Sequence, residues 1–498
     1  MDFLILNQLG YPVLSTLIFL PLAGAVVLFL LRNETTAKVW SLIISIVTFA
    51  LSLPLYFNFD ITTYKYQFAE HIPWIPGFKI NYTLGVDGIS LLLVLLSTLL
   101  TPICILASWK YIEKRVKEFL FCLLLIETAC VGVFSALDFV LFYIFFEAML
   151  VPMYLLIAVW GGPAKVYASI KFFIYTMAGS VFLMVAMIAL YLNTGTFSIP
   201  ELMTHTYSFN FQFWVFLAMG IAFAIKVPMA PLHTWLPAAH VEAPTAGSVI
   251  LASVLLKMGT YGFVRFCLPI LPQASIYFAP YVFWISIISI LYGGYVALGQ
   301  SDMKRLIAYS SVAHMGFVTL GTFLFNKSGL EGAMLQMINH GVTTGALFLC
   351  VGIIYERSHS RLISINSGIS KIMPVYIGFL GLFSLSSMAF PGTNSFVGEL
   401  LVLIGTFADN KLIGALTIPG VVLAAAYMLR LLQKIAWGGQ GNPSFKDMNL
   451  REIVYLVPLA IFVLWIGFSP GPFLDVMHAS VDHLIQQVQA GSALALVK

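Results

Sequence analysis

The sequence contains little charge for its length. Asp, Glu, Lys and Arg make up 9% of its 498 residues, whereas hydrophobic residues make up 60%. Soluble globular proteins carry about 25% charged residues, so the chain lies outside that class. Disordered, collagen-like, coiled-coil and nucleic-acid-binding chains are excluded as well, because each needs charge or repeat chemistry that is missing here. The composition indicates a polytopic membrane protein.

Cysteines are few and scattered through apolar runs, with no CxxC pair. The five are Cys104, Cys122, Cys130, Cys267 and Cys350. An iron–sulfur cluster needs closely spaced cysteines, and the sequence shows no GxGxxG or Walker loop for a nucleotide. We therefore expect buried structural thiols, and no redox centre, bound cofactor or metal ion in this chain.

Long apolar runs are abundant. Cutting the sequence at its polar and Pro/Gly breaks leaves about fourteen runs of the ~20 residues that a helix needs to cross a bilayer. They lie near 11–31, 37–56, 84–108, 118–136, 138–160, 167–192, 211–237, 246–268, 276–298, 304–325, 330–354, 373–406, 412–434 and 452–470. The predicted fold is an all-α membrane protein with about fourteen transmembrane helices. The first run does not resemble a cleaved signal peptide, since Asp2 replaces the usual basic residues and the run is too long.

Lysine and arginine are distributed unevenly between the two sides of these spans. Of the 25 such residues, two lie deep within spans, six lie in loops or span ends on one side, and the remaining 17 lie in loops or span ends on the other. The six are Lys65, Lys79, Arg265, Lys327, Lys411 and Lys498. Because cytoplasmic loops carry the excess of Lys and Arg, both termini are expected on the non-cytoplasmic side.

Residues 472–498 differ in kind from the spans. Leu474, Met477, Val481 and Leu484 recur at helical spacing with polar residues between them. This pattern predicts an amphipathic helix on the outer surface. Docking on a neighbouring subunit and lying in the lipid interface both fit it.

Ionisable residues fall well inside several expected spans. They are Glu147, Lys226, Lys257, His314, His340 and Glu399. A charge in the middle of a bilayer costs about 2.5–3.5 kcal/mol on insertion scales, so it usually marks a pathway. A single buried histidine is more often a core residue with a hydrogen-bond partner, but six such groups on neighbouring spans are hard to explain in that way. We interpret them as a relay for protons or ions.

Two of these spans are interrupted by proline. Lys226 begins the run KVPMAPLHTWLP, and Glu399 lies in FPGTNSFVGEL, where Asn394 or Ser395 is expected to cap the restarted helix. Discontinuous helices in corresponding positions mark transport sites, because the freed backbone groups need water or an ion.

The broken spans are the fourth members of two blocks of five spans, and an odd number of spans inverts the second block. The expected organisation has three initial spans in 1–117 and a first repeat in 118–270. An inverted repeat follows in 271–438, and a last span with the amphipathic helix occupies 439–498.

A proton route can be drawn through these residues. Burial favours the neutral forms of lysine and glutamate, and a nearby opposite charge favours the charged forms. We expect Glu147 and Lys226 to pair across neighbouring helices. When the influence of Glu147 is lost, Lys226 would pass its proton toward Lys257. The two histidines, whose ordinary pKa of about 6.5 suits transfer, would carry it to Glu399.

Other polar residues have two interpretations each. Glu127 can accompany the relay or serve packing. His233, His240 and Glu242 could bind a metal ion, but their spacing matches no standard site. A loop cap or a water ligand is the preferred interpretation for these three.

Four runs carry a family resemblance. They are LGVDGISLLLVLLSTLLTPICILASW (84–109), FYIFFEAMLVPMYLLIAVWGG (142–162), KVPMAPLHTWLPAAHVEAPTAGSVILASVLLKMGTYG (226–262) and SDMKRLIAYSSVAHMGF (301–317). Over essentially its whole length the chain resembles the antiporter-like subunits of respiratory complex I, NADH:quinone oxidoreductase. Glu399 stands where the L-type and N-type subunits have lysine, and the chain stops at 498 without the long lateral helix of the L type. Both features favour the M type.

The resemblance implies fourteen spans, two inverted five-helix repeats and proton translocation driven by quinone reduction in a partner arm. It places the family's relay positions on the six ionisable residues named above. NADH, FMN, iron–sulfur clusters and quinone are then expected in other subunits, with L-type and N-type neighbours as partners in a bacterial inner membrane. The alternative is a subunit of a multisubunit sodium/proton antiporter or of a membrane-bound hydrogenase. A scaffold whose buried charges pair structurally is a third interpretation.

Overall fold

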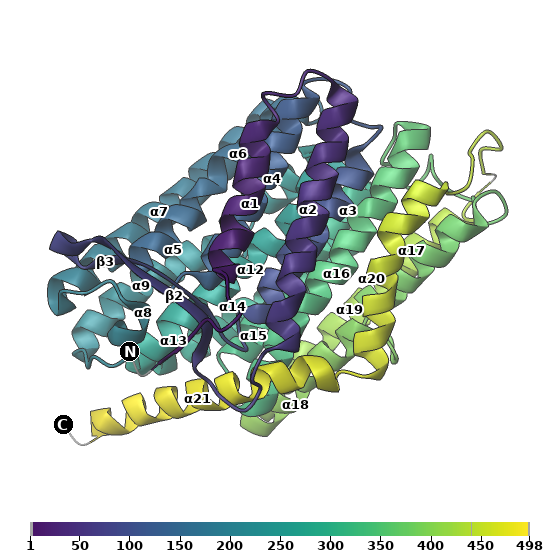
Figure 1. Cartoon of the computed structure of the whole chain (residues 1–498). Coiled ribbons are helices and arrows are strands. Elements are labelled where there is room, and N and C mark those ends of the chain that lie inside the picture. Colours follow the sequence, from purple (N-terminus) through teal and green to yellow (C-terminus); the bar gives the residue numbers. More distant parts are fainter. Residues whose placement is uncertain (1–2, 440, 497–498) are drawn as a thin grey trace.

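The computed structural model describes residues 3–439 and 441–496. Lys498, one of the six basic residues assigned to the outer side, lies outside these residues. Most helices stand side by side, and the first strand and the end of the last helix lie at the same end of the molecule (Figure 1). This placement agrees with an even number of crossings.

The described residues contain 11 helical segments that are long and apolar enough to cross a membrane. They are α2 (Glu34–Phe57), α3 (Leu91–Ser108), α4 (Val116–Ser135), α5 with α6 (Phe139–Ala148 and Leu150–Trp160), α7 (Lys165–Thr194), α9 (Phe209–Lys226), α11 to α13 (Thr245–Ile270), α14 (Pro272–Leu298), α16 (Lys327–Ser358), α19 (Lys411–Trp437) and α20 (Leu450–Phe468).

Further helices are shorter or more polar. They are α1 (Val13–Val27), α8 (Ile199–Leu202), α10 (Trp235–Glu242), α15 (Met303–Thr322), α17 (Pro374–Ser387), α18 (Asn394–Asp409) and α21 (Gly471–Leu496). Each of the fourteen expected spans has a counterpart among these helices. The helical membrane fold predicted from the sequence is therefore confirmed.

Short polar side chains mark where many helices begin, because they accept hydrogen bonds from the first free backbone N–H groups. The N-caps of this kind are Asn33, Asp138, Ser208, Asp302, Asn326, Asn410 and Asn449. Asn449 forms a full capping box with Glu452 at the start of α20. Local sequence thus sets the start of each of these seven helices.

A small sheet lies beside α1 and α5, toward the end of the bundle that carries both termini. Strand β1 (Leu4–Leu6) pairs parallel with β2 (Tyr66–Ile75), which pairs antiparallel with β3 (Ile80–Val86). The expected span at 84–108 therefore starts too early, and its helix begins at Leu91. A buried apolar strand and a buried helix segment look alike by hydropathy, which explains this error.

Two spans form the centre of the bundle. The most apolar 18-residue segments of α11–α13 and of α16 are buried along their whole length. The first of these spans consists of α11 (Thr245–Ile250), α12 (Leu256–Gly262) and α13 (Leu268–Ile270), joined by π-helical turns at Leu251–Leu255 and Phe263–Cys267. Such turns insert one residue into the helix and often lie at functional sites.

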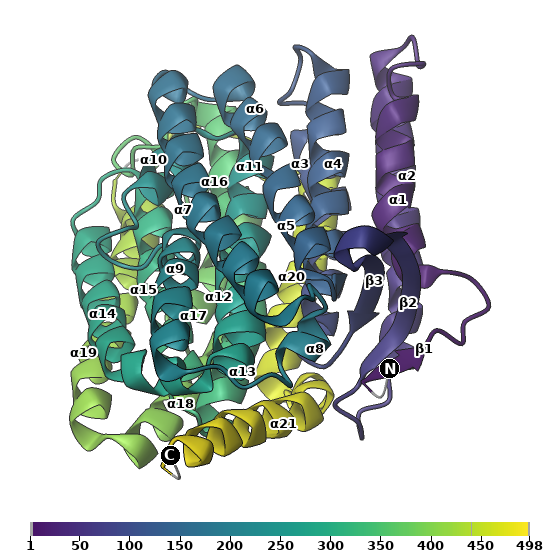
Figure 2. The ribbon, with the colours of Figure 1, turned by 90° about the vertical axis from the view of Figure 1, so that its left-hand side faces the viewer.

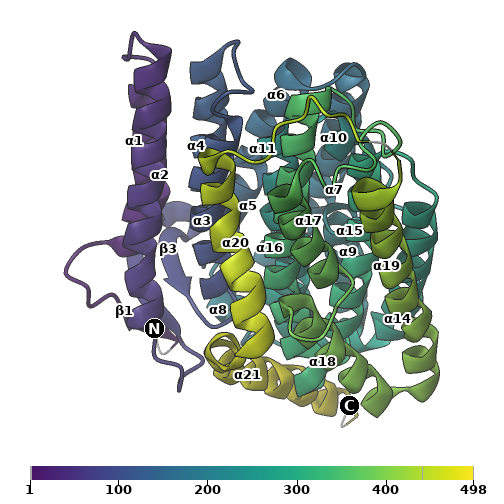
Figure 3. The ribbon, with the colours of Figure 1, turned by 90° about the vertical axis from the view of Figure 1, so that its right-hand side faces the viewer.

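Helix α21 lies across the end of the bundle that carries both termini in all three views (Figures 1, 2 and 3). Met477, Val481, Leu484 and Val488 are buried, and the helix packs against α13, α14 and α16 of the same chain. The amphipathic helix predicted for the tail is confirmed, and its apolar face is covered by this chain's own spans.

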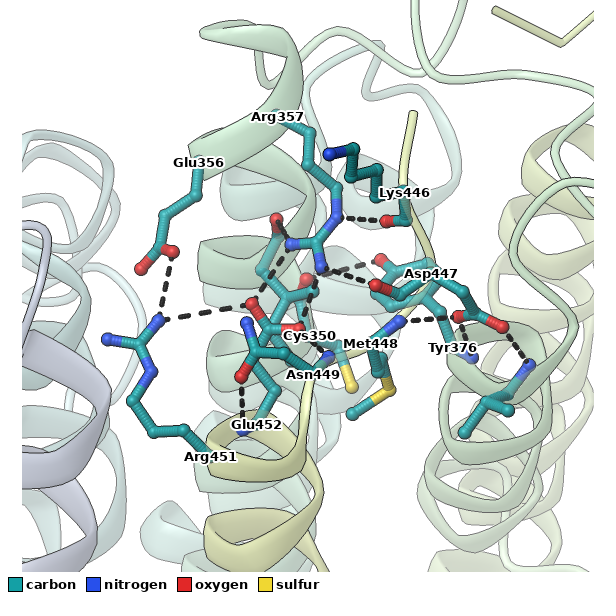
Figure 4. Close-up of polar contacts among 12 residues, drawn as sticks. Cys350, Glu356, Arg357, Tyr376, Lys446, Asp447, Met448, Asn449, Arg451 and Glu452 are labelled. Atoms are coloured by element: carbon teal, nitrogen blue, oxygen red, sulfur yellow. Dashed lines mark hydrogen bonds and ion pairs between the residues drawn. The ribbon is translucent and has the colours of Figure 1, made fainter. Parts of the chain in front are cut away.

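The opposite end of the bundle is closed by an ionic cluster around Arg357 at the end of α16 (Figure 4). Its guanidinium donates to both carboxylate oxygens of Glu452, at 2.7 and 3.1 Å. It also donates to the carbonyls of Lys446 and Asp447. Arg451 adds an ion pair with Glu356 at 3.1 Å. These contacts tie the loop before α20 to the end of α16.

Candidate functional site

The first broken span, α9 with α10, is interrupted directly after Lys226. Pro228 has no N–H, so the carbonyl of Ala224 accepts from the following residue at 2.9 Å. The carbonyl of Ile225 accepts from the indole N–H of Trp235 at 2.8 Å. These freed carbonyls thus keep their hydrogen bonds. Lys226 lies at the C-terminal end of α9, where the helix dipole favours a cation.

Lys226 is buried, and its nearest partners are apolar or aromatic. Its ammonium lies 3.8 Å from Met149 Sδ and 4.5 Å from the centre of the Phe146 ring. Glu147 lies near the end of α5, two residues before Met149. One carboxylate oxygen of Glu147 is buried and has no hydrogen-bond partner among the described residues. Among the described residues, Glu147 and Lys226 therefore do not form the ion pair that the sequence analysis expected.

Lys257 occupies the centre of the bundle on α12, directly after a π-helical turn, and is fully buried. Its ammonium donates to the carbonyl of Ala252 at 2.6 Å, and it lies 2.6 Å from Nδ1 of His340 on α16. The π turn lets that carbonyl accept from a side chain. The structure thus brings two of the six expected residues, Lys257 and His340, into contact.

The second broken span brings Glu399 to His314. Glu399 Oε1 lies 2.8 Å from His314 Nδ1, and both side chains are almost fully buried. On its other side the imidazole of His314 faces the hydroxyls of Ser387 and Tyr427, each at 3.3 Å from Nε2. Glu399 Oε1 also accepts a hydrogen bond from Gln336 at 3.0 Å.

Four of the six expected residues form one row: Lys257, His340, His314 and Glu399. The centres of the two imidazole rings are 5.9 Å apart, a gap that one water molecule can bridge. The row passes from α12 through α16 and α15 to α18, and so crosses the boundary between the two predicted repeats. Glu147 and Lys226 form a separate group on the α5 side. Within the described chain, no hydrogen bond links Lys226 to Lys257.

Several buried polar atoms along this row have no hydrogen-bond partner in the described part of the chain. They include Nε2 of His340, Oε2 of Glu399, Oδ1 of Asn339 and Oγ of Ser384. Buried polar groups are rarely left unsatisfied, and water is the usual partner where protein groups are missing. The row therefore has the polarity of a hydrated path.

The other residues singled out from the sequence lie apart from the row. Glu127 is buried, and neither of its oxygens has a hydrogen-bond partner among residues 3–439 and 441–496. His240 stacks on Phe348 with ring centres 4.7 Å apart. Glu242 accepts the N–H of Ala164 at 2.9 Å, so the loop-cap interpretation is confirmed for this residue. In the described residues, no group of three metal-ligating side chains comes together.

Sequence reasoning missed the amides and hydroxyls that surround Glu399. The expected cap, Asn394, is the first residue of α18, whose N-cap is Thr393. The side-chain amide of Asn394 turns toward α16 and donates to the main-chain carbonyl of Asn339 at 3.3 Å, and Asn339 Nδ2 donates to the main-chain carbonyl of Asn394 at 2.8 Å. The signal was the polar spacing of Gln336, Asn339 and Thr343 on an otherwise apolar span, which places all three on one helix face.

Comparisons with known proteins identify the family. Residues 136–424 match the family model described as NADH:quinone oxidoreductase/Mrp antiporter, TM. Residues 16–131 match the amino terminus of NADH-ubiquinone oxidoreductase chain 4. The chain is 46% identical over 499 residues to NADH-quinone oxidoreductase subunit M of Rhodobacter capsulatus, which covers 96% of this chain and 97% of the relative. The chain belongs to the subunit M family of NADH:quinone oxidoreductase. It is likewise 43% identical over 483 residues to chain 4 of Marchantia polymorpha, covering 96% and 97%.

Solved structures agree with membership of the subunit M family. A chain in respiratory complex I from Thermus thermophilus with bound NADH superposes with a TM-score of 0.89 at 29% identity, covering 95% of this chain and 99% of that one. A chain of the Mrp complex from Dietzia matches with a TM-score of 0.83 at 19% identity, covering 97% and 56%, which shows the shared fold alone. The chain is thus a multi-pass, proton-translocating membrane subunit of complex I, as the sequence predicted.

Proposed function

We propose that Glu147, Lys226, Lys257, His340, His314 and Glu399 form the proton relay of this subunit. The observation that supports this assignment is the row of buried contacts from Lys257 to Glu399. It joins residues on four helices from both predicted repeats, at distances that suit proton transfer. Each member is a titratable group, and a structural role alone gives no reason for so many in one line.

Glu147 controls Lys226 in this scheme. In this scheme Glu147 supplies the negative charge for an ammonium that otherwise faces Met149 and Phe146. When Glu147 is protonated or moves away, the ammonium loses its compensating charge, and proton release from Lys226 becomes favourable. Lys257 then receives a proton across the gap, and passes it to His340.

Glu399 is the last group of the relay. Its Oε1 accepts from the His314 side, and its Oε2 is buried without a partner among the described residues. Glu399 lies in the second turn of α18, where the positive end of the helix dipole stabilises a carboxylate. After each proton release, Glu399 is thus an ionised carboxylate that can accept the next proton.

The chemistry that drives this relay belongs to other subunits. We assign NADH, FMN, iron–sulfur clusters and quinone to them, and L-type and N-type antiporter-like subunits to the neighbouring positions in the membrane. A bacterial inner membrane is the proposed location. The two relatives named in the comparison come from a bacterium and from a plant, and both are named as oxidoreductase subunits.

The test uses the whole complex in inverted membrane vesicles. Glu147→Gln and Glu399→Gln should each reduce NADH-driven vesicle acidification to less than about a tenth, because one member of a relay that acts as a unit is lost. Glu118→Gln is the matched control, since Glu118 is an exposed glutamate in the first turn of α4. NADH:ferricyanide activity measures assembly independently. Full acidification in Glu399→Gln vesicles would contradict the assignment, and acidification that needs sodium would favour the antiporter interpretation.

A further inference from the structure

The restart of the second broken span is surrounded by buried amide side chains. Asn394 begins α18, and Gln336 and Asn339 lie one turn apart on the face of α16 that packs against α18. Each is at most 1% exposed, as is Glu399. Side-chain amides that are this deeply buried are expensive unless their donors and acceptors are matched.

These amides form a hydrogen-bond chain with a fixed direction. Asn339 Nδ2 donates to the main-chain carbonyl of Asn394 at 2.8 Å and to Gln336 Oε1 at 3.3 Å. A main-chain carbonyl can only accept, so the Asn339 amide cannot reverse without losing this bond. Gln336 Oε1 is thereby engaged as an acceptor, and its Nε2 faces Glu399, whose Oε1 accepts at 3.0 Å. A backbone group at the helix restart thus decides that Glu399 receives a donor.

The close approach of α16 and α18 depends on a glycine beside Glu399. A Cβ atom on Gly398 would lie 2.5 Å from Gln336 Oε1 and 3.0 Å from Asn339 Nδ2. The first contact is shorter than a carbon atom can tolerate beside oxygen, and the second is tight for carbon beside nitrogen. The absence of a side chain at position 398 therefore makes room for the amide chain, and the chain is a built feature of this interface.

We propose that Gln336 is a positioning residue that holds the carboxylate of Glu399 in its orientation toward His314. This inference rests on the relay role proposed for Glu399. Two groups, the donor Gln336 Nε2 and His314 Nδ1, converge on Oε1, and Oε2 is left without a partner in the described chain. Gln336 therefore fixes which oxygen faces the incoming proton and which faces away. As a constant donor it also stabilises the ionised carboxylate that must exist between two transfers.

Other titratable groups surround Glu399 on the packed helices. They are His314 on α15, His340 on α16 and Tyr427 on α19, whose phenol faces His314. Gln336 differs from all three because its amide does not titrate between pH 5 and 10, so it keeps the same donor at every stage of the cycle.

Gln336→Met in the whole complex tests the proposal, because methionine keeps the length of the side chain and removes the amide. Glu399 should then stay protonated to higher pH, so the pH optimum of proton pumping per electron should move up by about one unit. In infrared difference spectra, the carboxylic-acid band that Glu399→Gln removes should persist to higher pH. Asn339→Leu should shift the optimum in the same direction by less, and the double variant should match Gln336→Met alone, since Asn339 acts through Gln336.

Thr406→Val on α18 is the matched control. Its hydroxyl is fully buried and bonds only to the carbonyl of Val402 on the same helix. A purely structural role of Gln336 would lower the amount of assembled complex and leave the pH optimum unchanged, as Thr406→Val should. If Glu399→Gln stops pumping but Gln336→Met keeps the wild-type optimum and band, the positioning role is wrong. If Glu399→Gln still pumps, the relay assignment fails first.

Discussion

Removal of the Arg357 guanidinium should destabilise the chain strongly, because it strands a buried carboxylate. In Arg357→Met the hydrophobic stem of the side chain is largely kept. Glu452, whose side chain is 1% exposed, loses its ion pair at 2.7 Å (Figure 4). Breaking a buried pair from one side costs about 3–5 kcal/mol. Glu452 keeps the N–H of Asn449 at 3.0 Å and has Arg451 at 3.9 Å, so we expect the lower limit of about 3 kcal/mol. This corresponds to roughly a 100-fold change in the unfolding equilibrium.

The assay is pulse proteolysis of the detergent-solubilised complex in urea, read on this subunit. Glu452→Gln introduced into Arg357→Met removes the stranded charge, and should recover at least half of the lost free energy. Lys446→Met is a control, since Arg357 contacts only the backbone carbonyl of that residue. The reasoning is refuted if Arg357→Met changes the free energy of unfolding by less than about 1 kcal/mol, or if the second substitution deepens the loss.

Two predictions concern the end of the bundle that carries both termini. Asp87→Asn should lower the free energy of unfolding by about 3 kcal/mol, measured in the same way, because it leaves the guanidinium of Arg265 buried without its carboxylate at 2.6 Å. A loss of unfolding free energy smaller than that of Tyr66→Phe would contradict this prediction. Burial lowers the pKa of His483 on α21 below its ordinary value of 6.5, against the opposing effect of the Asp87 charge. The undocked helix then binds more protons between the two pKa values, so docking weakens as pH falls below 6.5. Hydrogen exchange of residues 476–488 should accelerate there, and His483→Gln should remove the pH dependence.

Much of the fold could be predicted because each span is a long apolar run with a polar or proline break at its end. Hydropathy does not report backbone geometry, however. The run at 84–90 is apolar enough for a helix, but Leu84 and Val86 lie in β3 and are buried against neighbouring elements. Tertiary packing decided the structure of this segment. The loop chemistry at Asp87 that ends the strand was present in the sequence and was not recognised.

The candidate site was only partly readable from the sequence. Lone charges in apolar runs point to Lys226, Lys257 and Glu399 without any structure. Which of them meet is a different question, since it depends on helix packing. Lys257 reaches His340 because a π-helical turn precedes it, and no local sequence signal announces such a turn. Gln336 lies one turn from His340 on α16, yet its amide donates to Glu399 on another helix.

The two π-helical turns on either side of Lys257 set the directions in which the side chains of the central span point. Each one inserts a residue into the helical repeat, so every following side chain is turned by about 100° from where an unbroken α-helix would place it. The turn at Leu251–Leu255 aims Lys257 at His340, and the turn at Phe263–Cys267 resets the direction before α13. The number of residues in the preceding turn thus sets the direction in which the Lys257 ammonium points. Loss of a single residue in the first turn would swing Lys257 away from its partner while leaving the length and hydropathy of the span almost unchanged.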